Sequence, residues 1–484
     1  MNIGFYITSG HKGTILSVAN KVSIMKDCEV WIIARDKNVF NLSRKLLPHL
    51  KNNIIDISKI KPIDTDESII DRAMRMESTL GYLSSMLMSH SRSIGQGYLS
   101  NADRHPHIIR SLNTHEEKLV ELVVEFEKWE AILKLCDAKI IFGWSRPTIL
   151  SLLVSAKGGR FISFIHSRIG DKFMLVENHM LQNDNLIASV KDKLCTYDNE
   201  KKNIQYEVYE SHSYSIKSIN NYSFMNNLKK ASYACIHEIY KYIRGYRKPG
   251  SYIFCGWIPT LFRKVTAYKY WEKYGVSIDD MREKKTVIFP LHFEPEISLM
   301  HVSPEFNNSY EIICWVSKNL PADVVLVVKE NPWSFGIRSK YYYDRLRKIS
   351  NVELAQPDTN TKEWVDHSLF TVAISGTSGF ESVYYDKPVL SYGKYQIINY
   401  LPTVRFVSSF LETRTAINEL LLLNKDSSDF TKSKAVLHNA LMSCSFSLPK
   451  LAEYEKSDFL VDEIGTILTD RLYSQYINFF LEAK

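Results

Sequence analysis

The stretch of chain between residues 323 and 393 constrains the fold more than any other part of this sequence. It contains short apolar runs that are typical of buried strands, and each run ends in a polar loop. The run Val324–Val328 leads into a polar turn at residues 329–332, and the run Phe370–Ile374 leads into a loop at residues 375–379. An open α/β sheet binds its ligand beside loops that follow the carboxyl ends of parallel strands. The pattern therefore predicts a parallel sheet with a ligand site at these two loops.

The loop at residues 375–379 reads Ser-Gly-Thr-Ser-Gly, and a helix is predicted to begin within it. Such a loop offers backbone N–H groups, hydroxyl groups and the positive end of a helix dipole to an anion. We therefore expect Ser375, Gly376, Thr377 and Ser378 to hold the phosphate of a nucleotide. The alternative is that a serine or threonine only caps the amino end of a buried helix, and both descriptions can hold at once.

The order of these parts resembles the C-terminal half of GT-B glycosyltransferases, and most of all the bacterial capsule polysaccharide synthesis family, which includes the β-Kdo transferases. The family pattern is Lys-Glu-His-Pro after one strand, Ser/Thr-Gly-Thr-x-Gly-x-Glu after a later strand, and then Gly-Lys-Pro. The positions of this chain that match the pattern are Lys329, Glu330, Pro332, Gly376, Thr377, Gly379, Glu381, Lys387 and Pro388. The chain departs from it at Asn331, where the family has histidine, and at Asp386, where a glycine is usual.

The resemblance implies an α/β protein of the GT-B type, in which two Rossmann-like domains face each other across a cleft and a C-terminal helix crosses back. Strand and helix patterns alternate in both halves of the chain, as Rossmann-like sheets require. We expect an N-terminal acceptor domain with helical insertions over residues 1–270, a nucleotide-sugar-binding domain over residues 271–457, and a C-terminal helix over residues 458–484 that packs on the first domain.

Glu381 follows the phosphate loop by one helical turn, so its carboxylate is predicted to face the same side. In many GT-B enzymes a glutamate accepts hydrogen bonds from the ribose hydroxyls, and the resemblance gives Glu381 this role; the alternative is a solvated helix glutamate. In the resembling enzymes the histidine of the His-Pro pair contacts the donor phosphate. Asn331 keeps a donor there but carries no charge. We therefore expect Lys329 to supply the positive charge, against the alternative of a solvated surface turn.

His292 and Glu296 follow the first predicted strand of the second domain, at the edge that is expected to face the cleft. His292 is a candidate catalytic residue that contacts the phosphate or the carboxylate of the donor. Its alternative is a core histidine between two apolar neighbours. Glu296 is a candidate for binding hydroxyl groups of the donor or the acceptor.

In the first half of the chain, a Gly-His-Lys-Gly sequence at residues 10–13 follows the first predicted strand. We expect His11 and Gly13 to contact the substrate, because glycine lets a ligand approach a helix closely. After a later predicted strand, Arg168 suits the carboxylate of a sugar through its planar guanidinium. Asp171 and Glu177 are two candidates for the catalytic base or nucleophile, and the sequence does not rank them.

Composition argues against several other classes of protein. The seven cysteines are scattered without a Cys-x-x-Cys pair, which disfavours a structural zinc site or a disulfide framework and fits a reducing cytoplasm. Neither a dinucleotide fingerprint nor a metal-ligand spacing occurs, so we expect no metal and no cofactor, with a nucleotide-sugar as substrate. The net charge of +7 suits that donor or an anionic membrane surface, whereas no dense basic stripe suggests a nucleic acid.

No apolar run reaches the roughly 20 residues that a membrane-spanning helix needs, and the N-terminus is typical of a first strand rather than of a signal peptide. We therefore expect a cytoplasmic protein, with peripheral contact to the inner membrane or to capsule assembly proteins as a further option.

The function that we expect is that of a metal-independent GT-B glycosyltransferase in the synthesis of bacterial capsule or lipopolysaccharide. The resemblance suggests that Kdo or a related acidic sugar passes from a CMP-activated donor to a glycan or glycolipid acceptor. Two alternatives stay open. One is a UDP-sugar 2-epimerase, which shares the GT-B fold and needs no acceptor. The other is a catalytically silent scaffold of a capsule assembly complex, which the replacement of the family histidine by Asn331 favours.

Overall fold

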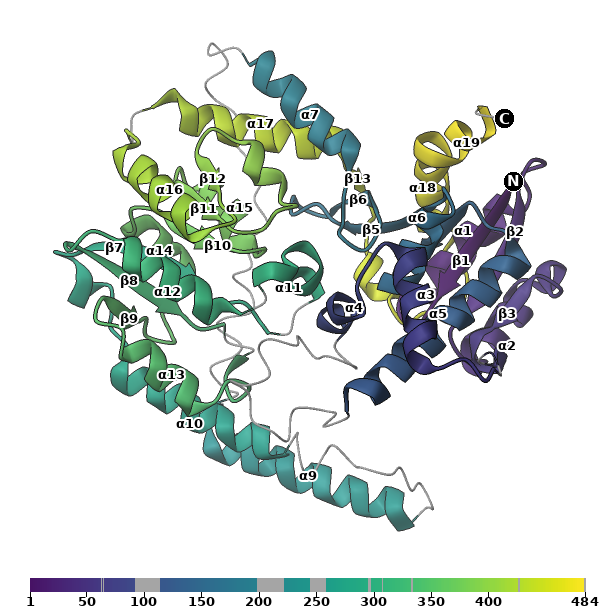
Figure 1. Cartoon of the computed structure of the whole chain (residues 1–484), viewed down its shortest axis with the longest axis horizontal. Coiled ribbons are helices and arrows are strands. Elements are labelled where there is room, and N and C mark those ends of the chain that lie inside the picture. The colour runs from purple at the N-terminus through teal and green to yellow at the C-terminus, as the bar shows by residue number, and fades with distance from the viewer. Residues whose placement is uncertain are drawn as a thin grey trace. The chain divides into compact units, whose positions relative to one another are not determined.

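A computed structural model describes most of the chain (Figure 1). The described residues are 1–61, 63, 65–91, 114–197, 222–243, 258–294, 297–306, 308–331, 334–424 and 427–482. The chain divides into two compact units by its contacts. The first unit consists of Met1–Met88, Asn113–Ser189 and Asn439–Lys484, and the second consists of Ser89–Leu112 and Val190–His438.

The described part of the first unit is built on a seven-stranded sheet. The order of its strands is β13 (Phe446–Ser447), β6 (Lys172–Glu177), β5 (Arg160–His166), β4 (Ile140–Gly143), β1 (Asn2–Ile7), β2 (Glu29–Ala34) and β3 (Ile54–Asp56). The strands from β5 to β3 are parallel, whereas β6 and β13 are antiparallel additions at one edge. The order of the parallel strands reverses between β1 and β4, and such a reversal marks the ligand edge of a Rossmann-like sheet.

The C-terminal segment belongs to the core of the first unit. Helix α18 (Asp462–Leu472) packs along helix α1 (Lys12–Val22), where Gly465 lies against Ser17. The Ser17 hydroxyl also donates to Asp462 Oδ1 at 3.3 Å. Apolar side chains of both helices cover the sheet, with Ile15, Val18 and Leu468 fully buried. The chain therefore returns to its first unit at its C-terminal end, as expected.

The other helices of the first unit begin and end at clear signals. Helix α5 (His115–Cys136) starts with a capping box. The Thr114 N–H donates to the Glu117 carboxylate at 2.9 Å, and the Glu117 N–H donates to the Thr114 hydroxyl at 3.2 Å. Its buried Leu122, Phe126 and Trp129 recur every three or four residues, so that one side faces the core. The remaining helices of this unit are α2 (Lys37–Leu46), α3 (Ile69–Leu80), α6 (Thr148–Ala156) and α19 (Asn478–Glu482), whereas α4 (Ser84–His90) and α7 (Asp184–Cys195) begin in the first unit and end in the second.

The second unit is built on a sheet whose six described strands are all parallel. Their order is β12 (Val404–Phe406), β11 (Val389–Ser391), β10 (Thr371–Ala373), β7 (Lys285–Pro290), β8 (Val324–Lys329) and β9 (Val352–Leu354). This is the Rossmann order, in which the first and fourth strands, β7 and β10, are neighbours. The loops that follow these two strands therefore meet at the ligand edge.

Helices cover both faces of this sheet, as Figure 1 shows. The helices in the described part of this unit are α9 (Phe224–Ile243), α10 (Ile258–Tyr274), α11 (Ile297–Val302), α12 (Ser309–Asn319), α13 (Lys340–Arg347), α14 (Thr361–His367), α15 (Thr377–Tyr384), α16 (Phe410–Leu422) and α17 (Ser428–Cys444). The core contains the fully buried Trp271, Phe335 and Tyr343. None of the described helices combines the length and the apolar character needed to cross a membrane.

The expected class, an α/β protein of the GT-B type with two Rossmann-like units, is confirmed; the cleft between the domains stays a prediction. The contacts divide the chain at other points than residues 270 and 457. Helix α10 joins the second unit because Trp271 packs against Phe335 and Tyr343. Residues 439–457 join the first unit because β13 pairs with β6.

Candidate functional site

The loops after β7 and β10 touch at the ligand edge of the second unit. His292 follows β7 and is buried, and its Nε2 accepts a hydrogen bond from the N–H of Ile374 at 3.3 Å. Its ring lies against Gly376, where an added Cβ would stand 2.6 Å from His292 Cε1. Only glycine fits this position without movement of the ring. The structure therefore brings two of the predicted site residues, His292 and Gly376, into direct contact.

The loop after β10 leaves the amino end of α15 without a side-chain cap. The N-cap residue is Gly376, which has no side chain to cap the first turn. Ser375 is buried, and its hydroxyl has no hydrogen-bond partner among the described residues. Thr377 is exposed at the first helical position, and Ser378 is buried at the second. No serine or threonine stands at the N-cap position of this helix, and the binding of an anion by the N–H groups of its first turn stays a prediction.

A neighbouring loop fixes the position of the loop after β10. Gln396 is buried, and its amide donates to the backbone oxygen of Ile374 and, at 3.2 Å, to the Ser391 hydroxyl. Gly393 lies so close to the same oxygen that a side chain there would collide with it. Gln396 was not a candidate in the sequence, because nothing in its local sequence shows that the loop after β11 folds against the loop after β10.

A buried ionic cluster joins the loops after β7 and β8. Arg338 is 4% exposed and lies between Glu294 and Glu330, with guanidinium-to-carboxylate distances of 3.4 and 2.6 Å. It also donates to the backbone oxygen of His292. Glu330 accepts further hydrogen bonds of 2.8 Å from the Tyr343 hydroxyl and from the N–H of Asn331. The cluster therefore holds His292 and Asn331 in fixed positions.

The electrostatics of this cluster follow from its burial. Burial alone would lower the pKa of Arg338, but Glu330 and Glu294 outweigh it, so that this pKa is raised. Burial raises the pKa of Glu330, although Arg338 and the Tyr343 hydroxyl act in the opposite direction. Arg338 was not a candidate in the sequence, because it follows the turn at a distance and its partners come from two different strands. Glu330, by contrast, matched the family pattern. Its carboxylate is needed in this structure as the partner of Arg338 and of the Tyr343 hydroxyl.

Lys329 lies apart from the phosphate loop. Its ammonium donates to the backbone oxygen of Pro357 at 3.5 Å, in the loop that follows β9. In the strand order, β9 lies on the far side of β8 from β10, with β7 between β8 and β10. Burial lowers the pKa of Lys329 to about 8, while Asp358, Glu330 and Glu363 act to raise it. The structure therefore does not bring the expected positive charge of Lys329 to Ser375, because the side chain turns toward β9.

Four further positions that the sequence singled out have different outcomes. Asn331 has its N–H bound to Glu330, and its backbone oxygen accepts from Ser334 N at 2.8 Å. Glu381 is half-buried on α15, and its ribose role stays a prediction. Glu296 and Pro332 lie outside the described residues.

Asp386, where the resembling family has glycine, follows the end of α15 in the left-handed region with a φ of 54°. Glycine adopts this conformation without strain, and aspartate is one of the few other residues that tolerate it. Lys434 pairs with the Asp386 carboxylate at 2.6 Å. This departure from the pattern therefore concerns the backbone at the far end of α15 and not the phosphate loop.

His11 in the first unit occupies the position that corresponds to His292, after the first strand of its sheet. It is buried, and its ring centroid lies 4.4 Å from that of Trp144. Its backbone N–H donates to the backbone oxygen of Glu455 at 2.7 Å. Its Nδ1 is buried without a hydrogen-bond partner among the described residues, and burial lowers the pKa of the ring. Gly13 is glycine for packing, because a side chain there would collide with Ser457 and Phe459 of the C-terminal segment. A substrate contact of Gly13 stays a prediction.

The turn between β5 and β6 holds Arg168 and Asp171 at the carboxyl edge of the first sheet. Arg168 has a φ of 70°, and its N–H donates to His166 Nδ1 at 2.9 Å. Asp171 is exposed and accepts from the Ser447 hydroxyl at 3.3 Å. Both residues therefore lie where a ligand of this sheet is expected.

Glu177 lies at the opposite edge. Strand β6 runs antiparallel to β5, so its last residue, Glu177, pairs with Ile162 near the start of β5. Its carboxylate forms an ion pair with Arg160, at the first position of β5. Glu177 was predicted to lie near Asp171, because the local sequence does not reveal the antiparallel direction of β6. The structure separates these two catalytic candidates and leaves only Asp171 at the carboxyl edge.

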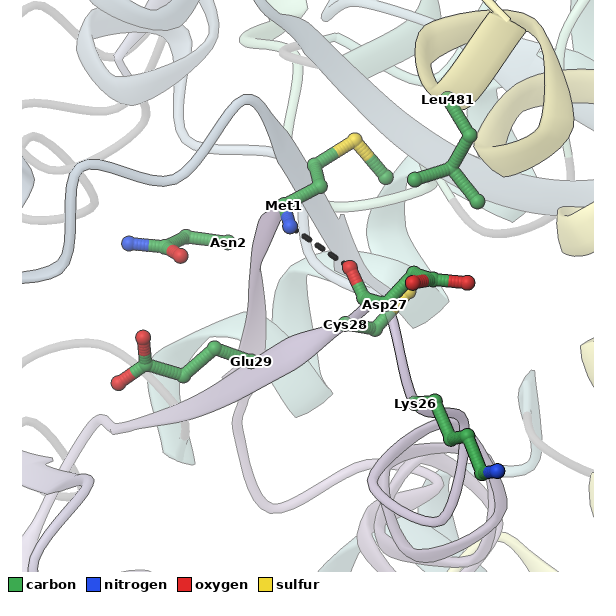
Figure 2. A pocket seen from close by; sticks show the side chains of 7 residues that line it. All are labelled: Met1, Asn2, Lys26, Asp27, Cys28, Glu29 and Leu481. Carbon is green, nitrogen blue, oxygen red and sulfur yellow. Dashed lines mark hydrogen bonds between the residues drawn. The ribbon is translucent and has the colours of Figure 1, made fainter.

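A surface pocket of the first unit lies away from the ligand edge (Figure 2). Met1, Asp27 and Cys28 line it near the amino ends of β1 and β2, together with Leu481 of α19. The Met1 ammonium donates to the backbone oxygen of Asp27 at 2.7 Å across it, as Figure 2 shows. Ligands of open parallel sheets bind at the carboxyl edge, so we assign this pocket no role. In the described part of the chain, no group of three or more His, Cys, Asp or Glu side chains is arranged to hold a metal ion.

Comparison with known proteins gives one family match. Residues 191–397 match the model of the capsule polysaccharide biosynthesis protein family. This range includes β7, β8 and β10, and both loops that meet at His292. The resemblance read from the sequence is thereby confirmed for this part of the chain. None of the curated protein sequences compared with the chain matches it.

Several solved structures are similar to the chain at low identity. A Staphylococcus aureus MnaA–UDP co-structure is 10% identical, with a TM-score of 0.27, and the alignment covers 99% of this chain and 96% of that one. KpsC of Thermosulfurimonas dismutans, described as a β-Kdo 2,7 transferase, is 12% identical, with a TM-score of 0.31 and coverage of 63% and 79%. The UDP-GlcNAc 2-epimerase of Methanocaldococcus jannaschii is 9% identical, with a TM-score of 0.27 and coverage of 91% and 98%. At these scores the similarities carry no argument about function.

Proposed function

We propose, from the membership of residues 191–397 in the capsule polysaccharide biosynthesis family, that this chain is a glycosyltransferase of bacterial surface polysaccharide synthesis. The donor that we propose is a CMP-activated acidic sugar, with Kdo as the first choice, and the acceptor is a glycan or a glycolipid. The nucleotide binds at the ligand edge of the second unit, and the acceptor binds at the ligand edge of the first.

The observation that carries this proposal is the uncapped amino end of α15 at the reversal of strand order. Backbone N–H groups of the first turn and the Ser375 hydroxyl, which is buried without a partner, form a site for the phosphate of the donor. Hydrogen bonds of this kind strengthen as negative charge develops on the leaving phosphate. Catalysis then depends on the positioning of donor and acceptor and on stabilisation of that charge, without a covalent step on the second unit.

His292 is the second contact that we propose for the phosphate. Because its Nε2 accepts from the N–H of Ile374, the neutral ring carries its proton on Nδ1. Nδ1 lies on the Gly376 side, 3.2 Å from the point that a Cβ of Gly376 would occupy. The ring therefore lies beside the loop at residues 375–379. In this proposal His292 supplies the phosphate contact that the family histidine, replaced here by Asn331, makes in the resembling enzymes.

The remaining assignments rest on position within the sheets. Glu381, on the helix that begins at the phosphate loop, binds the ribose hydroxyls. Asp171, exposed at the carboxyl edge of the first unit, is the carboxylate that activates the acceptor hydroxyl. We do not propose Glu177 for this role, because it is paired with Arg160 at the other edge.

A nucleotide panel tests the proposal. CMP, CDP, UDP and GDP are added to the full chain, and the shift of the unfolding temperature is measured for each. A ligand that binds only the folded state stabilises by mass action, so we expect the largest shift with CMP. Transfer from CMP-Kdo to lipid-linked acceptors, detected by mass spectrometry, then tests the reaction itself. Conversion of a UDP-sugar without any acceptor would instead indicate the epimerase, and binding of no nucleotide at all would leave the scaffold.

Contact with the membrane is a separate part of the proposal, and helix α9 supports it. Its exposed apolar side chains recur at helical spacing, and those more than half exposed along one side are Met225, Ile236, Ile239 and Ile243. The side that is buried instead consists of small or polar residues, Asn227 and Ala231. An apolar face of this size on a soluble surface marks an interaction site.

We propose that an anionic lipid bilayer is the partner of this face. Lys229 and Lys230 lie on α9, and the chain as a whole carries a net charge of +7. An apolar face with nearby lysines is the pattern of helices that lie in the interface of an anionic bilayer. Sedimentation with phosphatidylglycerol vesicles tests this, with neutral phosphatidylcholine vesicles as the comparison. Ile236→Ser with Ile239→Ser should reduce binding several-fold, whereas Leu411→Ser with Leu422→Ser, two exposed leucines of α16, should not. Equal loss in both pairs would contradict the assignment to α9.

A further inference from the structure

Arg146 lies at the ligand edge of the first unit, and the proposed function assigns it no role. It follows β4 by three residues and precedes α6 by two. Strands β4 and β1 are the neighbours between which the order of parallel strands reverses. The loop that holds Arg146 follows β4, and β4 occupies the same place in the first sheet as β10 does in the second.

The contacts of Arg146 leave the Nε atom of its guanidinium unsatisfied within the described part of the chain. Its Nη1 donates to the Ser163 hydroxyl at 3.3 Å, and that hydroxyl donates in turn to the backbone oxygen of Trp144 at 3.3 Å. The Nε atom of Arg146 is buried and has no hydrogen-bond partner among the residues that the structure describes. No carboxylate of the described residues forms an ion pair with it. The side chain is thus a sheltered cation held by one neutral hydroxyl.

Two other arginines with little exposed side chain have carboxylate partners. Arg72 pairs with Glu127 at 2.7 Å, and Arg338 pairs with both Glu294 and Glu330. The pKa of Arg72 and that of Arg338 are raised by these partners. Burial lowers the pKa of Arg146 to about 10, and no charged neighbour counteracts it. Within one chain, Arg146 therefore differs from the arginines that serve structure alone.

A sheltered cation without a counter-ion is unfavourable unless an anion joins it. The planar guanidinium matches carboxylate and phosphate groups through paired hydrogen bonds. The buried and unpartnered Nδ1 of His11 lies after β1, the neighbouring strand of the same edge, and its ring contacts Trp144. Two unsatisfied polar groups thus follow the two strands at which a ligand is expected.

We propose that Arg146 binds an anionic group, a carboxylate or a phosphate, of the glycan or sugar substrate at the ligand edge of the first unit. This inference rests on the proposed function, since it specifies the chemistry of the substrate that the first unit receives. It also differs from the sequence expectation, which gave the carboxylate of a sugar to Arg168.

The test uses the full chain and three small probes in ligand-observed NMR titrations. Methyl glucuronide carries a carboxylate, glycerol phosphate carries a phosphate, and methyl glucoside is the neutral control. We expect one of the two anions to bind more tightly than the glucoside, and which of them binds identifies the source of the charge. Arg146→Met should weaken that binding roughly tenfold or more, the loss of charge-assisted hydrogen bonds, while Arg168→Met should change it much less.

Three results overturn the inference: neither anion binds better than methyl glucoside, Arg146→Met binds both as the wild type does, or Arg168→Met is the variant that loses binding. CMP binding, measured on the same samples, separates this outcome from the fate of the proposed function. If CMP stabilises the protein and the anions do not bind, only the role of Arg146 is lost. If CMP also fails, the proposed function itself is contradicted.

Stability without ligand gives a second readout. Because Arg146 lacks a counter-ion, Arg146→Met should unfold at the same temperature as the wild type or higher. Arg72→Met, which leaves the buried Glu127 with only the longer contact to Arg75 at 3.6 Å, is the matched control and should unfold at a lower temperature. An equal decrease for both variants would show that Arg146 serves the fold, and the inference would be withdrawn.

Discussion

In each unit, a histidine that follows the first strand packs against the loop that follows the neighbouring parallel strand. In the second unit this is His292 against Gly376, and in the first it is His11 against Trp144. The two ligand edges nevertheless differ in charge. The sheltered arginine of the second edge, Arg338, is paired with two carboxylates, whereas that of the first, Arg146, has none among the described residues.

This difference indicates that the two edges offer different groups to a ligand. In the second unit, the charges neutralise one another and fix two loops, so the ligand meets backbone N–H groups, a hydroxyl and the ring of His292. In the first unit, a cation remains for the ligand itself to neutralise. A donor phosphate suits the former, and an anionic group of the other substrate suits the latter. The predictions below test each side of this comparison.

The largest expected effect concerns the paired arginine. Arg338→Met leaves Glu294 and Glu330 buried without a counter-ion, and breaking a buried pair in this way costs about 3–5 kcal/mol of unfolding free energy. Urea unfolding of the variant and of the wild type measures it. A loss below about 1 kcal/mol would mean that the cluster does not hold the second edge together.

Lys329 provides a pH-dependent test, because burial lowers its pKa to about 8. An unfolded lysine titrates near 10.4. Between these two pH values the unfolded state binds more protons, so stability rises with pH; below about 8 both states are charged, and the burial penalty is fully present. The wild type should therefore gain about 2–3 kcal/mol relative to Lys329→Met between about pH 7 and pH 10.5. A difference that stays constant over this range would contradict the buried position of the ammonium.

The smallest of these effects concerns the Ser375 hydroxyl, which has no partner inside the protein. Ser375→Ala should leave stability nearly unchanged but weaken CMP binding by about 1–3 kcal/mol, the value of a hydrogen bond to a charged group. Ser382→Ala is the matched control, because its hydroxyl donates to Thr371 and to Ser378 O at 2.7 Å and is expected to affect stability only. Calorimetry and thermal unfolding of both variants give the two quantities. The opposite pattern would assign Ser375 to the fold.

Much of the second unit could be predicted from the sequence, because strand, loop and helix follow one another directly there. The strand Val324–Val328 and the loop at residues 375–379 were recognised from local patterns. Arg338 and Arg146 were not, because their meaning depends on partners from distant parts of the chain. Glu177 was misplaced for a similar reason: its edge of the sheet is set by the antiparallel direction of β6, which its own residues do not reveal.

The central claim is that the first turn of α15 binds the phosphate of the nucleotide. Hydrogen–deuterium exchange of the backbone amides at residues 376–379 measures this directly, because those N–H groups are the proposed donors. With CMP, exchange in this segment should slow, whereas cytidine, which lacks the phosphate, should have little effect. Unchanged exchange at residues 376–379 under saturating CMP, or equal protection by cytidine, would contradict the account.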